Sequence, residues 1–303
     1  MKKITLLALL FGVATAFEAA AQTPITIAAA RALAPAANGT AGPTVTVRGI
    51  VTNGGELGSA NSTIRYMQDG TAGVGVYSPT SGPSAALVGS LVPGDSILVT
   101  GGLKMYRGLL EIDPITTITV LAGGRPLPAP VAFAAANFTA AYAEAYEGQL
   151  VRLNGVTSVT TSTGGPVATF SAAATYRLNG LATLPTYVNT NSTGPDGLIG
   201  KPAPTGTFDV IGVMSQFATT VAGTANGYQL LNRKYSDFVQ GNTPNFTGNP
   251  VPSNIGTTGF TVTYTTQNAG TTQLGYSTSP TGTLTPITPN AAPSTAHSVV
   301  LTG

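Results

Sequence analysis

Residues 66–78, YMQDGTAGVGVYS, have the pattern of a β-hairpin. The dipeptide Asp69-Gly70 near its centre suits the positive φ angles of a tight turn between two strands. Short strand-like segments separated by turns lie on both sides, so the hairpin predicts the middle of a small β unit. That unit consists of a first strand (45–53), the hairpin, a loop with some helical character (84–92), a long strand (95–104) and a last strand (107–121).

The same pattern occurs a second time in the chain. Strand-like segments of residues 45–121 have counterparts, in the same order, within residues 150–239. The separation between counterparts grows slowly, which is typical of a duplicated unit whose second copy has longer loops. A glycine inside a long strand lets the strand bend, as closure of a small barrel requires. The matched glycines are Gly49 with Gly155, Gly101 with Gly212, and Gly108 with Gly227.

The composition favours an all-β protein. Hydrophobic residues are 42% of the 303-residue chain, enough for buried cores, whereas charged residues are only 8%, far below the roughly 25% of an average soluble protein. Glycine (38 residues) and proline (22 residues) are abundant, as expected for many short strands joined by turns. We therefore expect an all-β fold with two consecutive five-stranded barrels, short helices and part of a β-sandwich.

The first 21 residues have the pattern of a signal peptide. A basic start, MKK, precedes an apolar run too short to span a bilayer, and three alanines fit a cleavage site before Gln22. We expect a secreted chain, extracellular or at the cell surface, with the periplasm as the alternative and no membrane span after cleavage. Cleavage removes two of 13 basic and one of 11 acidic residues, so the mature chain is nearly neutral.

These patterns predict the organisation of the chain. A segment with helical character (26–33) precedes the first copy, and a stronger helix candidate within 133–150 precedes the second, with Phe138, Tyr142 and Tyr146 on one core-facing side. After the second copy, a linker rich in proline, glycine and asparagine leads to alternating strands. The expected bounds are 1–21 for the signal peptide, 22–125 and 126–240 for the barrels, 241–254 for the linker and 255–303 for a partial sandwich.

Several of these segments resemble a known fold family. The segments VTVRGIVT (45–52), YMQDGTAGVGVYS (66–78) and the run from DSILVTGGL to GLLEI (95–112) resemble an OB-fold domain of exported bacterial multidomain proteins. Residues 146–239 resemble it less closely, and the final segment resembles the first strands of a fibronectin type III domain. The resemblance implies a longer protein, often with a hydrolase or a sorting module downstream, and the final 54 residues are fewer than the roughly 100 of a complete sandwich.

The resemblance implies candidate binding residues in the first copy. Lys104, Tyr106 and Arg107 fall in the loop between strands four and five, one of two loops that OB-folds use to bind oligonucleotides or sugars. Tyrosines give stacking surfaces and arginines contact phosphate. The other candidates lie on strands one to three and are Arg48, Arg65, Tyr66 and Tyr77.

The charge pattern argues against strong nucleic-acid binding. Residues 44–121 hold four basic and five acidic side chains, and affinity for nucleic acid rests on neutralising several phosphates. The second-copy counterpart of the KMYR tip, residues 215–226, has no cation. A hairpin tip kept soluble by Lys104 and Arg107 is therefore the favoured interpretation.

Catalytic chemistry has little support in the sequence. The absence of cysteine excludes thiolate chemistry and zinc fingers. The single histidine, His297, is expected on a strand surface, and Glu111 and Asp113 are expected at a solvated edge rather than as a catalytic pair. The oxygen-rich loop at 190–200 is expected to be a turn rather than a calcium site. We expect no catalytic residue, metal site or cofactor.

Three functions remain open on the sequence alone. The favoured one is a non-catalytic extracellular binding or spacer module of a larger secreted bacterial protein. The first alternative is an oligonucleotide-binding accessory region of a secreted nuclease, acting through Arg48, Tyr66, Lys104, Tyr106 and Arg107. The second is a carbohydrate-binding module in which Tyr66, Tyr77 and Tyr106 stack on sugar rings. The partner is accordingly an oligonucleotide, a polysaccharide or none.

Overall fold

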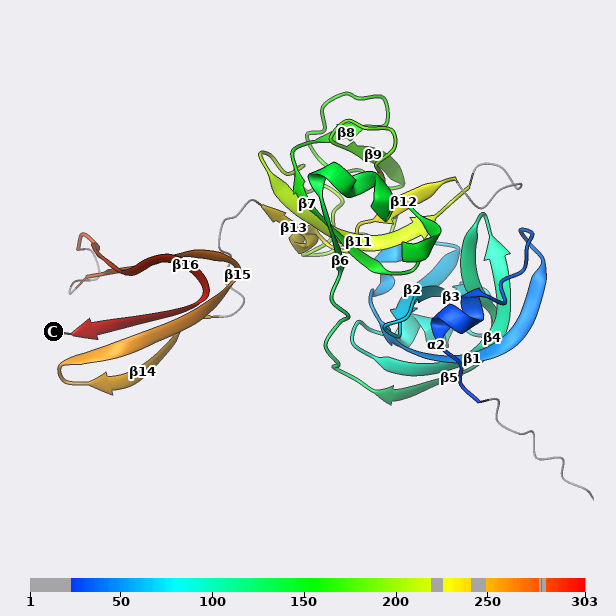
Figure 1. Ribbon diagram of the computed structural model, residues 1–303, viewed down its shortest axis with the longest axis horizontal. Coiled ribbons are helices and arrows are strands. Elements are labelled where there is room, and N and C mark those ends of the chain that lie inside the picture. The colour runs from blue at the N-terminus through cyan, green and yellow to red at the C-terminus, as the bar shows by residue number, and fades with distance from the viewer. Residues whose placement is uncertain (1–22, 219–225, 241–248, 278, 280–281, 303) are drawn as a thin grey trace, which may run out of the picture.

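The protein is built of several separate β-sheets (Figure 1). The computed structural model describes residues 23–218, 226–240, 249–277, 279 and 282–302, and the expected signal peptide at 1–21 lies outside them. Strands make up 51% of the structure and helices 11%, which confirms the all-β class.

The first sheet is a closed barrel of five strands, here called the first barrel. Its strands pair in the order β1-β2-β3-β5-β4, with β4 returning to β1. Neighbours are antiparallel except β3 and β5, which are parallel. The bounds are β1 (Ala41–Val51), β2 (Ser62–Gln68), β3 (Gly73–Pro79), β4 (Ser96–Tyr106) and β5 (Leu109–Ala122). The hairpin at 66–78 is confirmed as the junction of β2 and β3.

Three short helices accompany the first barrel. Helix α1 (Ile27–Arg31) begins at Thr26, whose hydroxyl accepts a hydrogen bond from the backbone amide of Ala29. Helix η1 (Gly55–Leu57) follows β1, and helix α2 (Ala85–Ser90) lies between β3 and β4. The segments 26–33 and 84–92, both expected to have helical character, therefore each contain a helix.

The interior of the first barrel is filled by alternate residues of its strands. In β4, Ile97, Val99 and Leu103 point inward, because successive side chains of a strand point to opposite faces. The inward set also includes Val45, Val47, Met67, Val74, Val76, Leu110 and Ile112. The intervening residues of β2, β3 and β5 therefore face away from the interior of the barrel.

The second unit is an eight-stranded sheet in the order β6-β7-β11-β12-β10-β9-β8, with β13 paired to β11. Strands β7, β11, β12, β10 and β9 follow the same order as β1, β4, β5, β3 and β2, and the parallel pair recurs between β10 and β12. The bounds are β6 (Val131–Ala134), β7 (Leu150–Val156), β8 (Val159–Thr161), β9 (Ala174–Leu178), β10 (Pro185–Val188), β11 (Phe208–Gln216), β12 (Tyr228–Leu231) and β13 (Phe238–Gln240).

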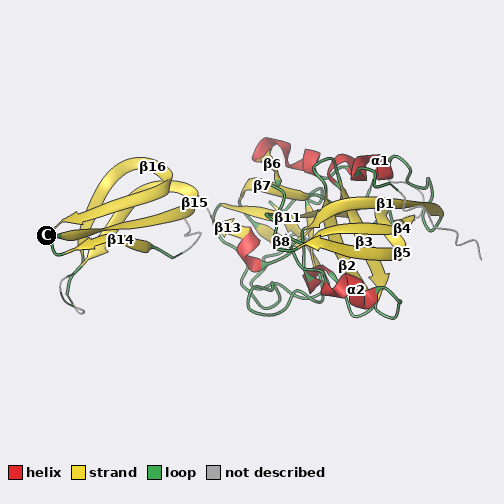
Figure 2. Cartoon of the chain, turned by 90° about the horizontal axis from the view of Figure 1, so that it is seen from below, coloured by secondary structure: helices red, strands yellow, loops and turns green. Residues whose placement is uncertain are grey.

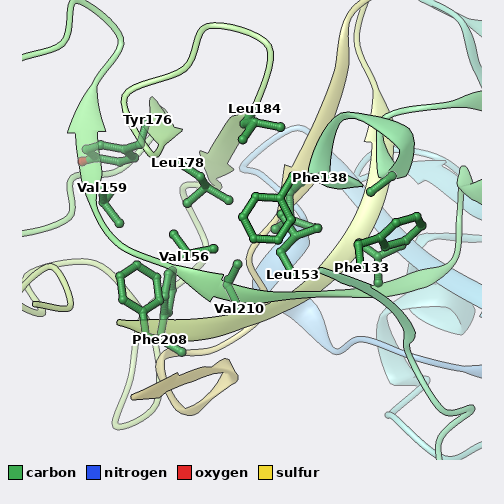
Figure 3. Packing of buried hydrophobic residues seen from close by; sticks show 14 of the residues in the cluster. Phe133, Phe138, Leu153, Val156, Val159, Tyr176, Leu178, Leu184, Phe208 and Val210 are labelled. Atoms are coloured by element: carbon green, nitrogen blue, oxygen red, sulfur yellow. The ribbon is translucent and has the colours of Figure 1, made fainter. Parts of the chain in front are cut away.

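The second unit differs from the first barrel in the pairing of its first strand. In the first barrel β1 pairs with both β4 and β2, whereas in the second unit β7 pairs with β11 and the following strand β8 pairs with β9. The first strand is therefore broken in two, near Gly155 at φ 83°. The strand ladder of the second unit therefore does not close on itself as that of the first barrel does. The core of the second unit is shown in Figure 3.

The single helix expected within 133–150 does not form. The segment instead forms β6 and two 3-10 helices, η2 (Ala135–Ala141) and η3 (Glu144–Tyr146). Extended backbone at Ala143 separates them and lets Glu144 and Glu147 reach Arg31 of α1. The aromatic residues still pack in the core, where Figure 3 shows Phe133 and Phe138. Tertiary packing thus overrides the helical pattern of the segment.

The C-terminal sheet has three antiparallel strands, β14 (Val251–Gly256), β15 (Gly259–Tyr276) and β16 (Thr285–Thr302). It begins at Val251, inside the segment expected to be a linker. His297 is 4% exposed, so it is buried rather than on the strand surface expected for it. Its two ring nitrogens are hydrogen-bonded to Thr266 at 2.9 Å and Thr272 at 2.8 Å. Its ring also stacks on Tyr264. The fibronectin-type sandwich stays a prediction.

The first barrel and the second unit lie side by side (Figure 2) and share an apolar cluster. Its members are Leu57, Ile64, Tyr66 and Leu109 from the first barrel and Leu150, Val213 and Leu231 from the second unit. Polar contacts border this cluster. Glu147 Oε1 accepts hydrogen bonds from Arg31 at 3.0 Å and from the backbone amide of Leu110 at 3.1 Å. The first barrel and the second unit therefore pack face to face.

We expect the stability of this interface to fall as pH rises from about 4.5 to 7. Burial raises the pKa of Glu147 to about 7, although Arg31 opposes the shift. The folded state therefore holds this proton more tightly than the unfolded chain, and the advantage is lost as pH rises through that window. Thermal unfolding at a series of pH values measures the slope, which Glu147→Gln should reduce.

The matched control for that prediction is Glu144→Gln, which alters the more exposed carboxylate on Arg31. It should keep most of the slope between pH 4.5 and 7, because burial of Glu147 contributes more to its raised pKa than the charge of Glu144 does. An equal slope in Glu147→Gln and the unaltered protein would contradict the assignment of the slope to Glu147.

Candidate functional site

A cleft of about 390 Å³ lies between the first barrel and the second unit. Its first-barrel wall is the outer face of β2, β3 and β5 with the end of β4, and its other wall comes from β9 to β12. The lining residues are Leu57, Ser62, Ile64, Tyr66, Tyr77, Tyr106, Leu109 and Glu111 on one side, and Thr175, Tyr187, Asn189, Ser215, Gln216, Phe217, Gln229 and Leu231 on the other.

Strand register places the floor of the cleft on the first barrel. Tyr66 lies opposite Gly75, Gly75 opposite Glu111, and Glu111 opposite Lys104, so one row crosses β2, β3, β5 and β4. Gly75 has no side chain, and a Cβ there would already contact Ile64 at 3.4 Å. The Ile64 and Glu111 side chains therefore both pack over Gly75.

The floor is tied to the second unit through Tyr66. Its hydroxyl lies 2.8 Å from the hydroxyl of Ser215, and the side chain is 1% exposed. Burial raises the pKa of Tyr66 far above its usual range, so it is a neutral phenol at all ordinary pH values. Tyr66 thus fixes one wall of the cleft against the other and leaves little of its ring for a ligand.

The opening of the cleft is aromatic. Tyr106 is 46% exposed and Phe217 is 48% exposed, and their rings meet edge to face with centroids 6.3 Å apart. The Arg107 guanidinium lies 4.7 Å from the centroid of Phe217, a distance that permits a cation–π contact. The backbone amide of Ala218 donates to the carbonyl of Arg107 at 2.7 Å.

These contacts explain the charged hairpin tip of the first barrel. The β4–β5 tip meets the end of β11, its own counterpart in the second unit. The counterpart lacks a cation but supplies Phe217, on which Arg107 packs. The Lys104 ammonium lies 2.6 Å from an Asp113 carboxylate oxygen, and this hydrogen bond raises the pKa of Lys104. The tip is therefore part of an interface rather than a free basic finger or a solvated turn.

Glu111 is the acidic group on the cleft floor, and the solvated edge expected for it is wrong. It is 3% exposed, because it faces the second unit across the cleft rather than the solvent. Burial, with a smaller contribution from Asp113, raises its pKa to about 8, against an opposing effect of Lys104. At neutral pH the carboxyl is therefore mostly protonated and can both donate and accept a hydrogen bond.

The structure separates the other two predicted residues from the cleft. Arg65 is 4% exposed and donates to the carbonyls of Leu91 and Gly89, both at 2.9 Å, so it binds the C-terminal end of α2. Arg65 and Tyr66 are neighbours in β2, so their side chains point to opposite faces of the sheet and cannot line the same cleft. Arg48 is exposed and lines a different groove, together with Asp69.

The cleft thus combines predicted and unpredicted residues. Tyr66, Tyr77 and Tyr106 line it, and Lys104 and Arg107 lie beside it. Sequence reasoning missed the whole wall of the second unit, above all Tyr187, Phe217 and Gln229. No local pattern marks these residues, because the wall arises only when the two halves pack together.

Other sites considered in the sequence have structural explanations. Within the described residues, no three histidine, aspartate or glutamate side chains are grouped so as to hold a metal ion. The Asp196 carboxylate accepts hydrogen bonds from the backbone amide and hydroxyl of Ser236, at 2.8 and 2.7 Å. No helix in the described ranges has the length and apolar character needed to cross a membrane.

Comparison with known proteins gives one informative similarity. No family model matches the chain. A segment of 124 residues, 40% of the chain, is 32% identical to part of Endonuclease YhcR from Bacillus subtilis strain 168. The matched segment is 10% of the length of that protein, so the chain spans only a small part of its relative. The aromatic cleft accordingly belongs to a chain that is similar, in part, to an endonuclease.

Proposed function

We propose that the first barrel and the second unit form an oligonucleotide-binding accessory region of a larger secreted nuclease. The observation that carries the proposal is the aromatic cleft, lined by Tyr77, Tyr106, Tyr187 and Phe217. The partial similarity to an endonuclease supports this function over the spacer hypothesis. The N-terminal signal-peptide pattern supports export.

The dimensions and lining of the cleft favour a single-stranded ligand. A volume of about 390 Å³ is near the lower end for ligand pockets, so it suits one unpaired base rather than a duplex. Aromatic rings stack on any base, at about 1–3 kcal/mol each. Tyr106 and Phe217 are half-exposed at the opening and offer such surfaces. Stacking of a base on these rings therefore supplies most of the binding free energy.

Electrostatic attraction is expected to be small. Lys104 is paired with Asp113, which leaves Arg107 as the less compensated cation beside the cleft. If Lys104 and Arg107 each neutralise one phosphate, the slope of log affinity against log salt concentration is about −1.4, since each phosphate of a single strand contributes about −0.7. A nearly neutral mature chain is compatible with this mode of binding.

The test is binding of a fluorescent single-stranded DNA oligonucleotide to the full chain, measured by anisotropy. We expect Tyr106→Ala and Phe217→Ala each to weaken binding about 5- to 150-fold, because each removes a stacking surface worth about 1–3 kcal/mol. Tyr276→Ala is the matched control. Tyr276 is 40% exposed but lies on β15, outside the cleft, so binding should not change.

Other outcomes would support the other hypotheses. Retention by a polysaccharide that is insensitive to salt and lost in Tyr106→Ala would support the carbohydrate module. Binding to neither ligand would support the spacer. If Tyr106→Ala and Tyr276→Ala weakened oligonucleotide binding equally, the cleft would not be the binding site.

A further inference from the structure

Glu111 has an environment that points to a ligand. Its side chain is 3% exposed and lines the cleft, and among the described residues its carboxyl has no hydrogen-bond partner. The nearby cation, Lys104, is hydrogen-bonded to Asp113 instead. The Glu111 oxygens are not among the fully enclosed polar atoms that lack a partner, so the carboxyl faces the open space of the cleft. A ligand with a matching polar edge in the cleft would satisfy this carboxyl.

The groups around Glu111 favour its neutral form. Lys104 on β4 and Asp113 on β5 largely compensate each other, and Glu147 adds negative charge from the side of the second unit. The remaining titratable neighbours are the phenols of Tyr66 on β2 and Tyr77 on β3, both of which have a pKa raised above the usual value. With burial, this arrangement keeps a proton on Glu111 at neutral pH.

We propose that Glu111 recognises the hydrogen-bonding edge of one unstacked base held in the cleft. This inference rests on the proposed function. A protonated carboxyl presents an O–H donor beside a C=O acceptor, so it can pair with any base edge that has a donor next to an acceptor. All four bases offer such an edge. The ionised carboxylate presents only acceptors and matches guanine, whose edge offers two adjacent N–H donors.

The consequence is a base preference that depends on pH. As pH rises through about 8, Glu111 loses its proton and places a carboxylate against the ring nitrogen of adenine or cytosine. Binding of these bases therefore weakens. Guanine instead donates its two adjacent N–H groups to the carboxylate, so its binding is maintained or strengthened.

The experiment measures affinities of the full chain for three pentanucleotides, dT2-dX-dT2 with X as adenine, cytosine or guanine, from pH 6.5 to 8.8, below the ionisation of guanine itself. We expect binding of the adenine and cytosine probes to fall about tenfold or more, relative to the guanine probe, across this range. Glu111→Gln keeps a donor beside an acceptor at every pH. This variant should lose the pH dependence and should not develop a preference for the guanine probe at high pH.

A second variant checks the electrostatic environment. Asp113→Asn removes a negative neighbour of Glu111, so the midpoint of the pH-dependent change should move to lower pH. Both variants are first shown to have the thermal unfolding transition of the unaltered protein at pH 6.5. A folded Glu111→Gln protein with an unchanged pH profile would overturn the inference.

Failure of the inference and failure of the proposed function give different results. If the pentanucleotides bind and Tyr106→Ala weakens their binding, but the base preference is the same at every pH, the inference about Glu111 is wrong and the proposed function stands. If none of the pentanucleotides binds at any pH, the proposed function is wrong and the inference fails with it.

Discussion

Replacing Arg233 with alanine is expected to lower the free energy of unfolding by about 3–5 kcal/mol. Arg233 holds both Asp237 carboxylate oxygens at 2.9 Å and donates to the carbonyl of Thr52 at 2.7 Å. The two charged side chains are only 7% and 5% exposed. Alanine therefore leaves a buried carboxylate without its counter-ion and breaks a contact between the second unit and the first barrel. Chemical denaturation measures the loss.

The matched control is Arg152→Ala, which removes a similar pair that is partly exposed to solvent. Arg152 binds Asp209 through two nitrogens, but these side chains are 23% and 20% exposed. Solvent screens such a pair, so a loss of about 1 kcal/mol or less is expected. Equal losses in the two variants would show that burial does not set the strength of the Arg233–Asp237 pair.

The first barrel is predictable from the sequence because its signals are local. The alternation of Val45 and Val47, the Asp69-Gly70 turn and the glycines of the long strands each act within a few residues. The repeat extends the prediction to the second unit, whose strands follow the same order. The break between β7 and β8 is not predictable, since it depends on which strand β9 meets in three dimensions.

The candidate cleft is predictable only in part, for a physical reason. Tyr77 and Tyr106 are predicted because the resemblance places them on a binding face. A solvated edge is predicted for Glu111 when its strand is considered alone, whereas packing against the second unit buries it. The same packing makes Arg107 a partner of Phe217 rather than a solvated cation. Contacts between the two halves leave no periodic pattern in either half.

The packing of the two halves leads to the second large expected effect, at Gly148. This residue has φ 77°, and a Cβ on it would lie 2.5 Å from the Gly73 carbonyl carbon and 2.6 Å from the Val74 nitrogen. Both obstructing atoms belong to backbone, so no side-chain rotation relieves the contact. We expect Gly148→Ala to push the first barrel and the second unit apart. Its cost combines about 1–2 kcal/mol of backbone strain with about 1–3 kcal/mol of overpacking.

Gly155→Ala separates these two contributions. Gly155 has φ 83°, similar to Gly148, but a Cβ there meets no atom within 4 Å. This variant should therefore show the backbone strain alone and should keep oligonucleotide binding, whereas Gly148→Ala should lose both stability and binding because the two walls of the cleft no longer meet. Differential scanning calorimetry and anisotropy measure the two effects. If Gly148→Ala bound as tightly as Gly155→Ala, the ligand site would have to lie within one half rather than between them.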